Sequence, residues 1–357
     1  MSTDLLLRKS RRKNISLFTI LLIVIFLLSV ISVFVGSSNM SIGDVFDALF
    51  FNSTAANNRI VWQIRMPRII AALVAGAGLS ISGLIMQTTL QNDMASPATL
   101  GVSNAAVFGA NLSIIAYAGG FLSTGNNLNQ YLAGINIFAT SLMAFVFAIL
   151  SILLVLGLCK IRNFSPTIIA LAGIAIGYIW NAATTILQFF ATDVGLSAAV
   201  IWNFGDLGRA TYKSDLFMFI VVFIGFLIFM LFSWKYNALL SGEDSAKTMG
   251  INVKAFRFIS LLVASLITAI CVSMLGTIGF IGIICPHIMK RIIGNDHRIL
   301  IPSSFLSGSI LLLFSDVLSR TIGNGTALPV GAITSLIGAP FFLFIIFSRG
   351  KNNAKSK

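Results

Sequence analysis

Long, almost uncharged apolar runs recur along the whole 357-residue chain. A helix needs about 20 apolar residues to cross the hydrocarbon core of a bilayer. Only 10% of the residues are charged, whereas a soluble domain carries about 25%. A transmembrane β-barrel would instead alternate over segments of about ten residues. The chain is therefore predicted to be an all-α, polytopic membrane protein. Its clearest apolar runs are Ile15–Gly36, Ile69–Leu90, Leu132–Cys159, Pro166–Phe190, Leu216–Trp234 and Phe258–Leu275.

The sequence predicts about ten membrane spans, some of them short or broken. The first run is longer than the apolar core of a cleaved signal peptide, so it is expected to be the first span. We expect one transmembrane domain at 15–348, between a basic N-terminal segment at 1–14 and a polar tail at 349–357. The spans are expected at 15–36, 69–90, 97–118, 132–159, 166–190, 215–234, 258–275, 280–293, 300–320 and 329–348.

Positive charges favour one side of the predicted spans. With ten spans, 18 of the 24 Lys and Arg residues fall on the side of the N-terminus. Cytoplasmic segments are enriched in Lys and Arg, so both termini are predicted to be cytoplasmic. The net charge of +13 is divided among short clusters between apolar runs, which argues against a nucleic-acid partner. The six cations left on the outer side are Arg59, Arg65, Arg68, Arg209, Lys213 and Arg320.

Acidic residues are scarce inside the predicted spans. Ion-coupled transporters bury carboxylates or histidines within the membrane, but only Asp316 of the eleven acidic residues falls well within a span. Arg320 follows four residues later on the same helix face, so the two are expected to pair. An ion-coupled secondary transporter is the alternative that this scarcity disfavours.

The sequence carries no P-loop, no nucleophile–base constellation and no metal-ligand cluster in register. The chain is therefore expected not to be an enzyme and to bind neither a cofactor nor a metal. Any energy for active transport would come from another polypeptide.

Two places interrupt the helical pattern. Gly276–Gly279 divides a long apolar stretch, and Pro286 follows within the next segment. A helix over 280–293 is too short to cross a bilayer alone at 1.5 Å per residue. Such backbone is tolerated only where protein or a water-filled cavity covers it. The second interruption is the polar turn Gln91–Pro97.

Three stretches carry recognisable motifs. Arg65–Gln87 reads R-x-P-R and then G-A-x-L-x-x-S-G-x-x-x-Q, and Leu100–Ser103 reads L-G-V-S. Gly276–Arg291 contains G-x-I-x-F-I-G and P-H, followed by D-H-R at Asp296–Arg298. Leu328–Phe342 reads L-P-x-G-x-x-T-x-x-I-G-x-P-x-F.

Together these motifs resemble the permeases of the iron-siderophore, haem and vitamin B12 ABC importers, the FecCD family of type II importers. They occur in the family's order and spacing, and the resemblance covers residues from about 40 to 348. Two positions depart from the pattern. The usual N-P-L reads Asn92-Asp93-Met94, and the usual W-x-x-G-S reads Trp202–Asp206 without the serine.

The resemblance implies an assembly in the cell membrane. It implies two permease chains, most simply a homodimer, with the substrate pathway on the dimer axis. Two ABC ATPase subunits would carry ATP and Mg²⁺, and an extracytoplasmic substrate-binding protein would dock on the other side. The cargo would be a metal chelate, most often a ferric siderophore in this family. Haem, cobalamin and oxyanions remain open.

The resemblance also implies a docking role for outer arginines. Arg65, Arg68 and Arg320 match family positions that receive acidic residues of the binding protein. Arginine forms bidentate pairs with carboxylates and is weakly hydrated, so such charges would orient a docking partner. The alternatives are contact with lipid headgroups or, for Arg320, pairing with Asp316.

An inner loop resembles the helices that couple such permeases to the ATPase. Ser241 is expected to cap a short helix that begins with acidic residues, and Gly250 is expected to end it. The alternative is a solvated helical turn. The coupling residues are predicted to be Ser241, Gly242, Glu243, Asp244, Ala246 and Gly250.

The family correspondence places the substrate pathway along the fifth span. Asn92 and Met94 would stand at the inner gate. Uncharged, mildly polar side chains would suit a bulky substrate that slips through rather than binds tightly. For any one of them the alternative is an interhelical hydrogen bond. The other pathway residues are predicted to be Asn181, Thr184, Thr185, Gln188 and Ser197.

Overall fold

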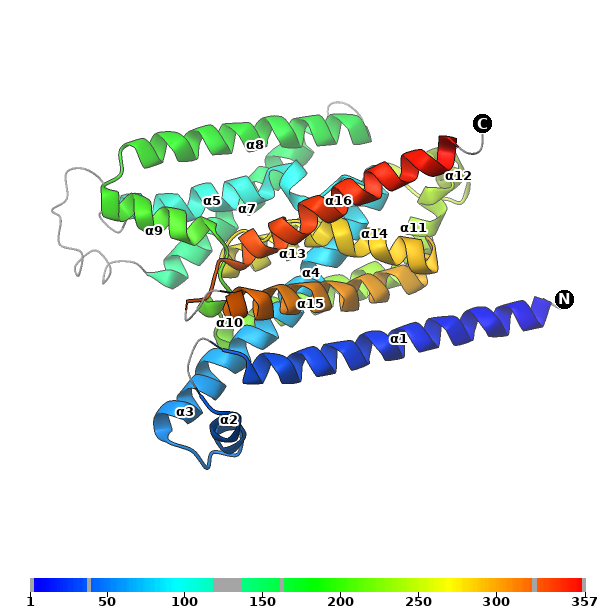
Figure 1. The fold of residues 1–357 in the computed structure, drawn as a ribbon. Coiled ribbons are helices and arrows are strands. Elements are labelled where there is room, and N and C mark those ends of the chain that lie inside the picture. Colours follow the sequence, from blue (N-terminus) through cyan, green and yellow to red (C-terminus); the bar gives the residue numbers. More distant parts are fainter. Residues whose placement is uncertain (1–2, 37–39, 118–135, 161–163, 323–325, 355–357) are drawn as a thin grey trace.

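The computed structural model describes residues 3–36, 40–117, 136–160, 164–322 and 326–354, and its regular elements in those ranges are helices (Figure 1). Each predicted span contains one, which confirms the all-α prediction. The corresponding helices are α1 (Thr3–Phe34), α4 (Met66–Thr89), α5 (Val102–Asn111), α7 (Ile137–Lys160), α8 (Pro166–Phe189), α10 (Tyr212–Leu231), α13 (Val253–Leu275), α14 (Ile281–Ile293), α15 (His297–Ile322) and α16 (Val330–Ala354).

Seven helical segments within the described residues are long and apolar enough to cross a membrane. The other three predicted spans are shorter. The third is composite, because the 3-10 helix η2 (Pro97–Leu100) precedes α5 and the π-helix η3 (Leu112–Tyr117) continues it. In α16 the apolar part is Val330–Leu343, and α14 has only 13 residues.

The predicted break between the seventh and eighth spans is present. Helix α13 ends at Leu275, Gly276 follows with φ +80°, and α14 begins after Phe280 with φ +66°. The freed backbone is bonded within the protein, since the Leu275 carbonyl accepts the amide of Asp206 at 2.8 Å. Pro286 lies inside α14 and is buried. The predicted break is therefore present, and the carbonyl that it frees at Leu275 is satisfied within the protein.

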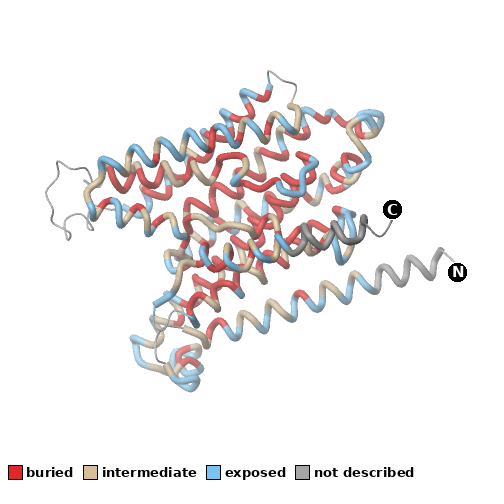
Figure 2. The backbone as a smooth tube through the Cα atoms, turned by 45° about the horizontal axis from the view of Figure 1, so that its top comes forward, coloured by how far each residue is buried: buried red, intermediate tan, exposed pale blue. Residues whose placement is uncertain are grey.

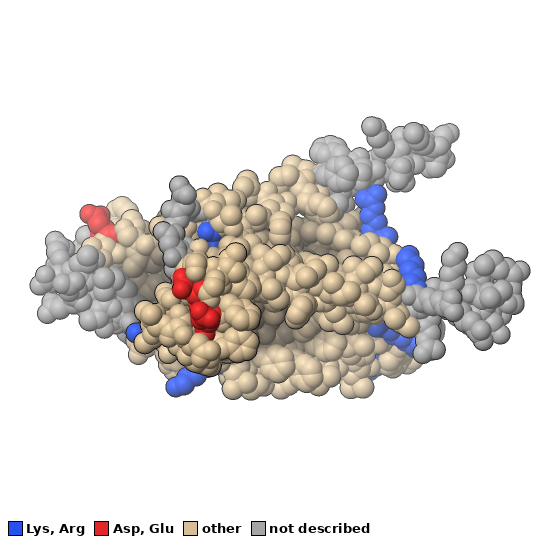
Figure 3. Space-filling model, turned by 60° about the horizontal axis from the view of Figure 1, so that its bottom comes forward, with Lys and Arg blue, Asp and Glu red and all other residues tan. Residues whose placement is uncertain are grey.

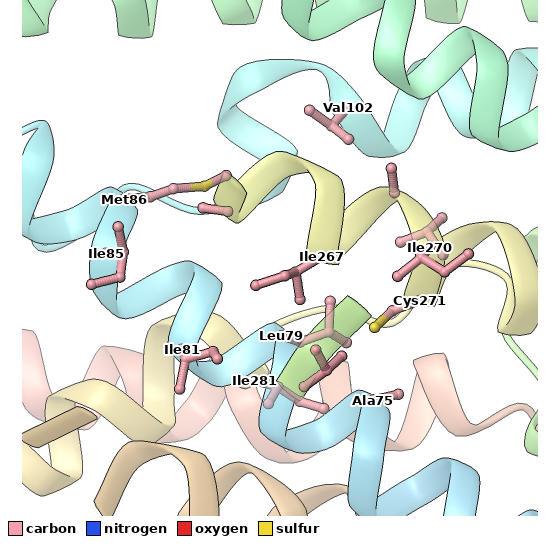
Figure 4. Packing of buried hydrophobic residues seen from close by; sticks show 14 of the residues in the cluster. Ala75, Leu79, Ile81, Ile85, Met86, Val102, Ile267, Ile270, Cys271 and Ile281 are labelled. Carbon is pink, nitrogen blue, oxygen red and sulfur yellow. The ribbon is translucent and has the colours of Figure 1, made fainter. Parts of the chain in front are cut away.

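Helix α4 forms the centre of the molecule, and most of its residues are buried. Helices α10, α13, α14 and α15 surround it, and buried residues concentrate in this middle region (Figure 2). Figure 4 shows Ala75 and Leu79 of α4 beside Ile267 and Cys271 of α13. The apolar contacts are dense, but lipid is equally apolar, so close van der Waals packing holds these helices together.

Glycine pairs bring α4 against two neighbours. A Cβ on Gly76 would meet the backbone of Gly308 on α15, and a Cβ on Gly83 would meet that of Gly282 on α14. These contacts account for the small residues of the second span, because only glycine lets the backbones approach so closely.

Both chain termini lie at one end of the molecule, with α11 (Ser233–Leu240) and α12 (Glu243–Thr248) (Figure 1). We call this the α12 end. The opposite end, the α2 end, carries α2 (Ile42–Leu49), α3 (Ala55–Arg59) and α9 (Asp193–Asn203). On the face in Figure 3, charged side chains lie toward these two ends and an uncharged band separates them. The cytoplasmic side remains a prediction from the charge bias.

The two basic chain ends continue their helices. Helix α1 begins at Thr3 and α16 runs to Ala354. Residues 3–14 and 349–354 are therefore helical extensions of the first and last spans. Residues 1–2 and 355–357 lie outside the described ranges.

The Gly83–Gly282 contact gives a direct test of packing. Gly83→Ala is expected to lower the melting temperature of the detergent-solubilised protein, because an added methyl group in a tight core costs about 1–3 kcal/mol. The matched control is Gly157→Ala on α7, where an added Cβ meets nothing within 4 Å. Equal melting temperatures for the two variants would contradict the proposed close packing.

Candidate functional site

The three arginines predicted to dock a binding protein lie at the α2 end and are buried. Arg65 ends the π-helix η1 (Ile60–Arg65), Arg68 lies in the first turn of α4, and Arg320 lies near the end of α15. Their exposed fractions are 4%, 7% and 6%. Docking through them stays a prediction. Their burial supports intramolecular contacts, which the sequence left as an alternative for Arg320.

Asp316 holds two of these arginines. Its Oδ1 accepts a hydrogen bond from Nε of Arg68 at 2.6 Å, and its Oδ2 lies 2.8 Å from Nη2 of Arg320. The carboxylate is fully buried, so the ion pair between α4 and α15 is shielded from water. The predicted Asp316–Arg320 pair is confirmed. Arg68 is a second partner that the sequence did not reveal, because the residues are 248 positions apart.

Arg65 and Arg320 also contact the end of α1. Arg65 Nη1 donates to the carbonyl of Val33 at 2.6 Å, and Arg320 Nη1 donates to that of Ser32 at 3.0 Å. The last carbonyls of a helix lack intrahelical partners, and cations are favoured beside them. The two arginines therefore fasten the end of α1 to α4 and α15. No local sequence signal marks this contact.

The predicted coupling helix forms at the α12 end, but its start differs from the prediction. Ser241 follows the last residue of α11 and does not cap α12. Gly242 is the N-cap, with φ +108°, a conformation that serine adopts only with strain. The predicted end is confirmed, since Gly250 follows the helix with φ +79°. Ala246 is buried beneath the loop.

The two acids of α12 have different surroundings. Asp244 is exposed and pairs with Lys247 at 2.9 Å, and the hydrogen bond from that ammonium lowers the pKa of Asp244. Glu243 points toward the protein and accepts a hydrogen bond from Nη2 of Arg257 at 2.5 Å. Arg257 is one of the 18 cations that the sequence places on the side of the N-terminus. It lies within α13 and is only 2% exposed, a burial that the sequence did not indicate.

Asp215 is a second charge that lies at a span end, as the sequence predicts, but its burial was not predicted. From the sequence it was placed at the end of a span. It is the fourth residue of α10 and is buried, 2% exposed. The predicted span began at residue 215, whereas α10 begins three residues earlier at Tyr212. The helix therefore carries Asp215 against its neighbours.

The predicted gate residues Asn92 and Met94 lie exposed in the turn that follows α4. The side chain of Asn92 accepts the amide of Met94 at 2.9 Å. Between them stands Asp93, which departs from the family pattern. Asp93 pairs with Lys290 of α14 at 2.9 Å, and Lys290 also donates to Gln87 at 2.9 Å. The polar turn is thereby tied to the short helix α14.

The predicted pathway residues of α8 fall on two faces. Asn181 and Thr185 lie exposed on a stripe that includes Leu171, Tyr178 and Phe189. Ser197 on α9 is also exposed.

Thr184 and Gln188 face the protein instead. Thr184 is buried, and Gln188 donates to Oδ1 of Asn111 at 2.9 Å. Asn111 in turn donates to Asn203 of α9 at 3.0 Å. Gln188 therefore makes the interhelical hydrogen bond of the alternative, whereas the Thr184 hydroxyl donates to the Trp180 carbonyl of its own helix.

Removing the carboxylate of Asp316 tests the cluster at the α2 end. Asp316→Ala is expected to destabilise the protein by about 3–5 kcal/mol, because it leaves buried arginines without their counter-ion. Asp206→Ala is the matched control, since Asp206 is 46% exposed and lies 3.7 Å from Arg68. Its expected cost is about 0–1 kcal/mol. Thermal melting in detergent measures both, and equal losses would contradict the assigned role of Asp316.

Comparison with known proteins agrees with this geometry. Residues 21–348 match the model of the FecCD transport family. A "Putative ABC transporter permease protein" of Methanocaldococcus jannaschii is 41% identical, over 95% of this chain and 96% of that protein. A "Probable iron chelatin transport system permease protein" of Helicobacter pylori is 34% identical, over 81% and 82%. The vitamin B12 import system permease protein BtuC of Escherichia coli is 32% identical, over 97% and 99%.

A solved structure is similar over nearly the whole fold. It is described as "An inward-facing conformation of a putative metal-chelate type ABC transporter" and superposes with a TM-score of 0.77 at 25% identity, covering 94% of this chain and 99% of that chain. In this family the permease is a non-enzymatic transmembrane subunit, and ATP binds to a partner ATPase. The chain therefore belongs to the FecCD transport family and is a multi-pass permease subunit of an ABC importer in the cell membrane.

Proposed function

We propose that this permease moves a ferric siderophore inward through a pathway between two copies of the chain, driven by two ATPase subunits. The observation that carries this proposal is α12, a short helix presented at the α12 end with one acid exposed and the other anchored to the core. A helix presented in this way suits a partner's cleft.

The exposed face of α8 supports the dimer. Leu171, Tyr178 and Phe189 are 61%, 71% and 78% exposed. Lipid would accept these residues, but Asn181 and Thr185 lie on the same stripe and polar groups facing lipid are costly. A second copy that faces α8 across a pathway would accommodate both kinds of side chain.

The class of substrate is supported by the relatives and by the wall of this pathway. The Helicobacter relative is named for iron chelatin, the Escherichia relative for vitamin B12, and the similar structure for metal chelates. All are bulky metal complexes. The proposed wall carries amide and hydroxyl groups among apolar side chains and no charge on the described part of α8. Such a wall would hold a large chelate weakly.

The subunit composition tests this proposal. The tagged chain, solubilised from its native membranes and weighed by native mass spectrometry, is expected to carry a P-loop ATPase in a complex of two permease and two ATPase chains. The exposed α12 supplies the physical reason, because it offers a contact outside the membrane-spanning helices. A lone chain or a homo-oligomer that retains no ATPase even after crosslinking would refute the proposal.

We also propose that a substrate-binding protein docks at the α2 end, with Arg65, Arg68 and Arg320 shaping the surface it meets. Arg68→Gln is expected to weaken this association, most strongly at low salt, where charges act over longer distances. Surface plasmon resonance on complexes in lipid nanodiscs gives the rates.

The matched control for docking is Lys213→Gln. Lys213 lies exposed at the same end, so this variant removes one charge without touching the buried cluster. A binding-protein affinity at low salt that is unchanged in Arg68→Gln, or reduced equally in both variants, would exclude a specific role for Arg68.

A further inference from the structure

Arg257 is among the largest fully buried side chains of the described residues. It lies in the second turn of α13 at the α12 end. Its guanidinium donates in three directions, to three segments that are distant in sequence. These segments are the end of α4, the start of α8 and the start of α12.

The first contact reaches the helix that precedes the predicted gate. Arg257 Nε donates to the carbonyl of Thr89, the last residue of α4, at 3.1 Å. The turn with Asn92 and Met94 follows directly. The last carbonyls of a helix lack intrahelical partners, and this hydrogen bond satisfies one of them. It therefore fixes where the turn begins.

The second contact reaches the predicted pathway helix. Arg257 Nη1 donates to the carbonyl of Phe164 at 2.6 Å. Phe164 has φ +55°, a conformation that a bulky residue holds only when its surroundings impose it. Its ring packs against Phe258, the residue after Arg257, with centroids 6.0 Å apart. Helix α8 begins two residues later at Pro166.

The third contact reaches the coupling helix. Arg257 Nη2 donates to Oε1 of Glu243, the first residue of α12, at 2.5 Å. Glu243 is the only glutamate of the chain. Breaking this bond would leave a buried arginine without a counter-ion, which is strongly unfavourable. Displacement of α12 should therefore carry Arg257 with it.

We propose that Arg257 is a positioning residue that makes α12, the gate turn after α4 and the start of α8 move as one body. Its planar guanidinium holds three partners in fixed directions, which a flexible lysine does not reproduce. Through it, a push on α12 by the ATPase reaches the gate. This inference rests on the proposed coupling of α12 to an ATPase, and it assigns the connection between that contact and the pathway.

A single cysteine at the gate reports this connection. The probe is a membrane-impermeant maleimide that reacts with Met94→Cys, because Met94 is 50% exposed. The native Cys159, Cys271 and Cys285 are all buried, so the added thiol is expected to dominate the signal. Labelling rates are compared with and without vanadate-trapped nucleotide, in the complex with its ATPase in lipid nanodiscs. ATP hydrolysis is measured on the same samples.

With Arg257 intact, trapping is expected to change the labelling rate by about fivefold or more. In Arg257→Gln the change is expected to fall below about twofold while ATP hydrolysis continues. Arg257→Lys should restore part of the response. Glu243→Ala is the second variant, because it cuts only the α12 contact and leaves Arg257 with its two carbonyl contacts. Arg298→Gln is the matched control, an exposed arginine at the same end.

The possible outcomes distinguish a failure of the role of Arg257 from a failure of the proposed importer function. A full nucleotide response in Arg257→Gln, or in Glu243→Ala if Arg257→Gln does not assemble, would overturn the role of Arg257 and leave the importer intact. Absence of both hydrolysis and nucleotide response in the parent complex would overturn the proposed function and this inference together. A role limited to stability would lower hydrolysis and labelling response in parallel, and that result also contradicts the proposal.

Discussion

A bilayer core contains no water, so a charged or polar group buried there must find its partner inside the protein. Much of this structure follows from that constraint. Asp316 lies between Arg68 and Arg320, and Arg65 donates to the open carbonyl end of α1. At the opposite end Arg257 satisfies carbonyls of two other segments and one carboxylate. Each arginine thus fastens elements that apolar contact alone would not place.

Close backbone packing fills the space between these two polar regions. Glycine pairs let α14 and α15 approach α4, and the short helix α14 spans only part of the membrane depth beside it. At the backbone break before α14, the Leu275 carbonyl is bonded to the loop after α9 and is not left unsatisfied. The result is a rigid centre with polar attachments at each end, which suits a protein that must pass a displacement from one end to a pathway.

The sequence predicted most of the fold because hydrophobic length is a local property. Each of the ten predicted spans contains a helix, and the break at Gly276 and the pair Asp316–Arg320 follow from neighbouring residues. The sequence did not show what depends on distant contacts. Arg257 and Asp215 lie near span ends as predicted, but their burial against neighbouring helices was not indicated. The N-cap of α12 is Gly242 rather than Ser241, because the chain turns there through a positive φ.

The candidate site was predictable in outline and less so in detail. The resemblance predicts a coupling loop, a gate turn and docking arginines at particular residues, and these roles stay predictions. Spacing alone did not indicate that the arginines face inward or that Thr184 and Gln188 face the protein, because such orientation is set by packing between helices. Motif matches therefore identified the regions, and the contacts within them determine what each side chain can do.

Import by this permease is proposed to be driven by ATP rather than by an ion gradient. Uptake of a ⁵⁵Fe-labelled ferric siderophore, with a labelled cobalamin in parallel, is measured into proteoliposomes that hold the permease, its ATPase and its binding protein. Accumulation of a chelate is expected to require ATP and to persist when proton and sodium gradients are collapsed. Accumulation that follows an imposed ion gradient and ignores ATP would contradict it.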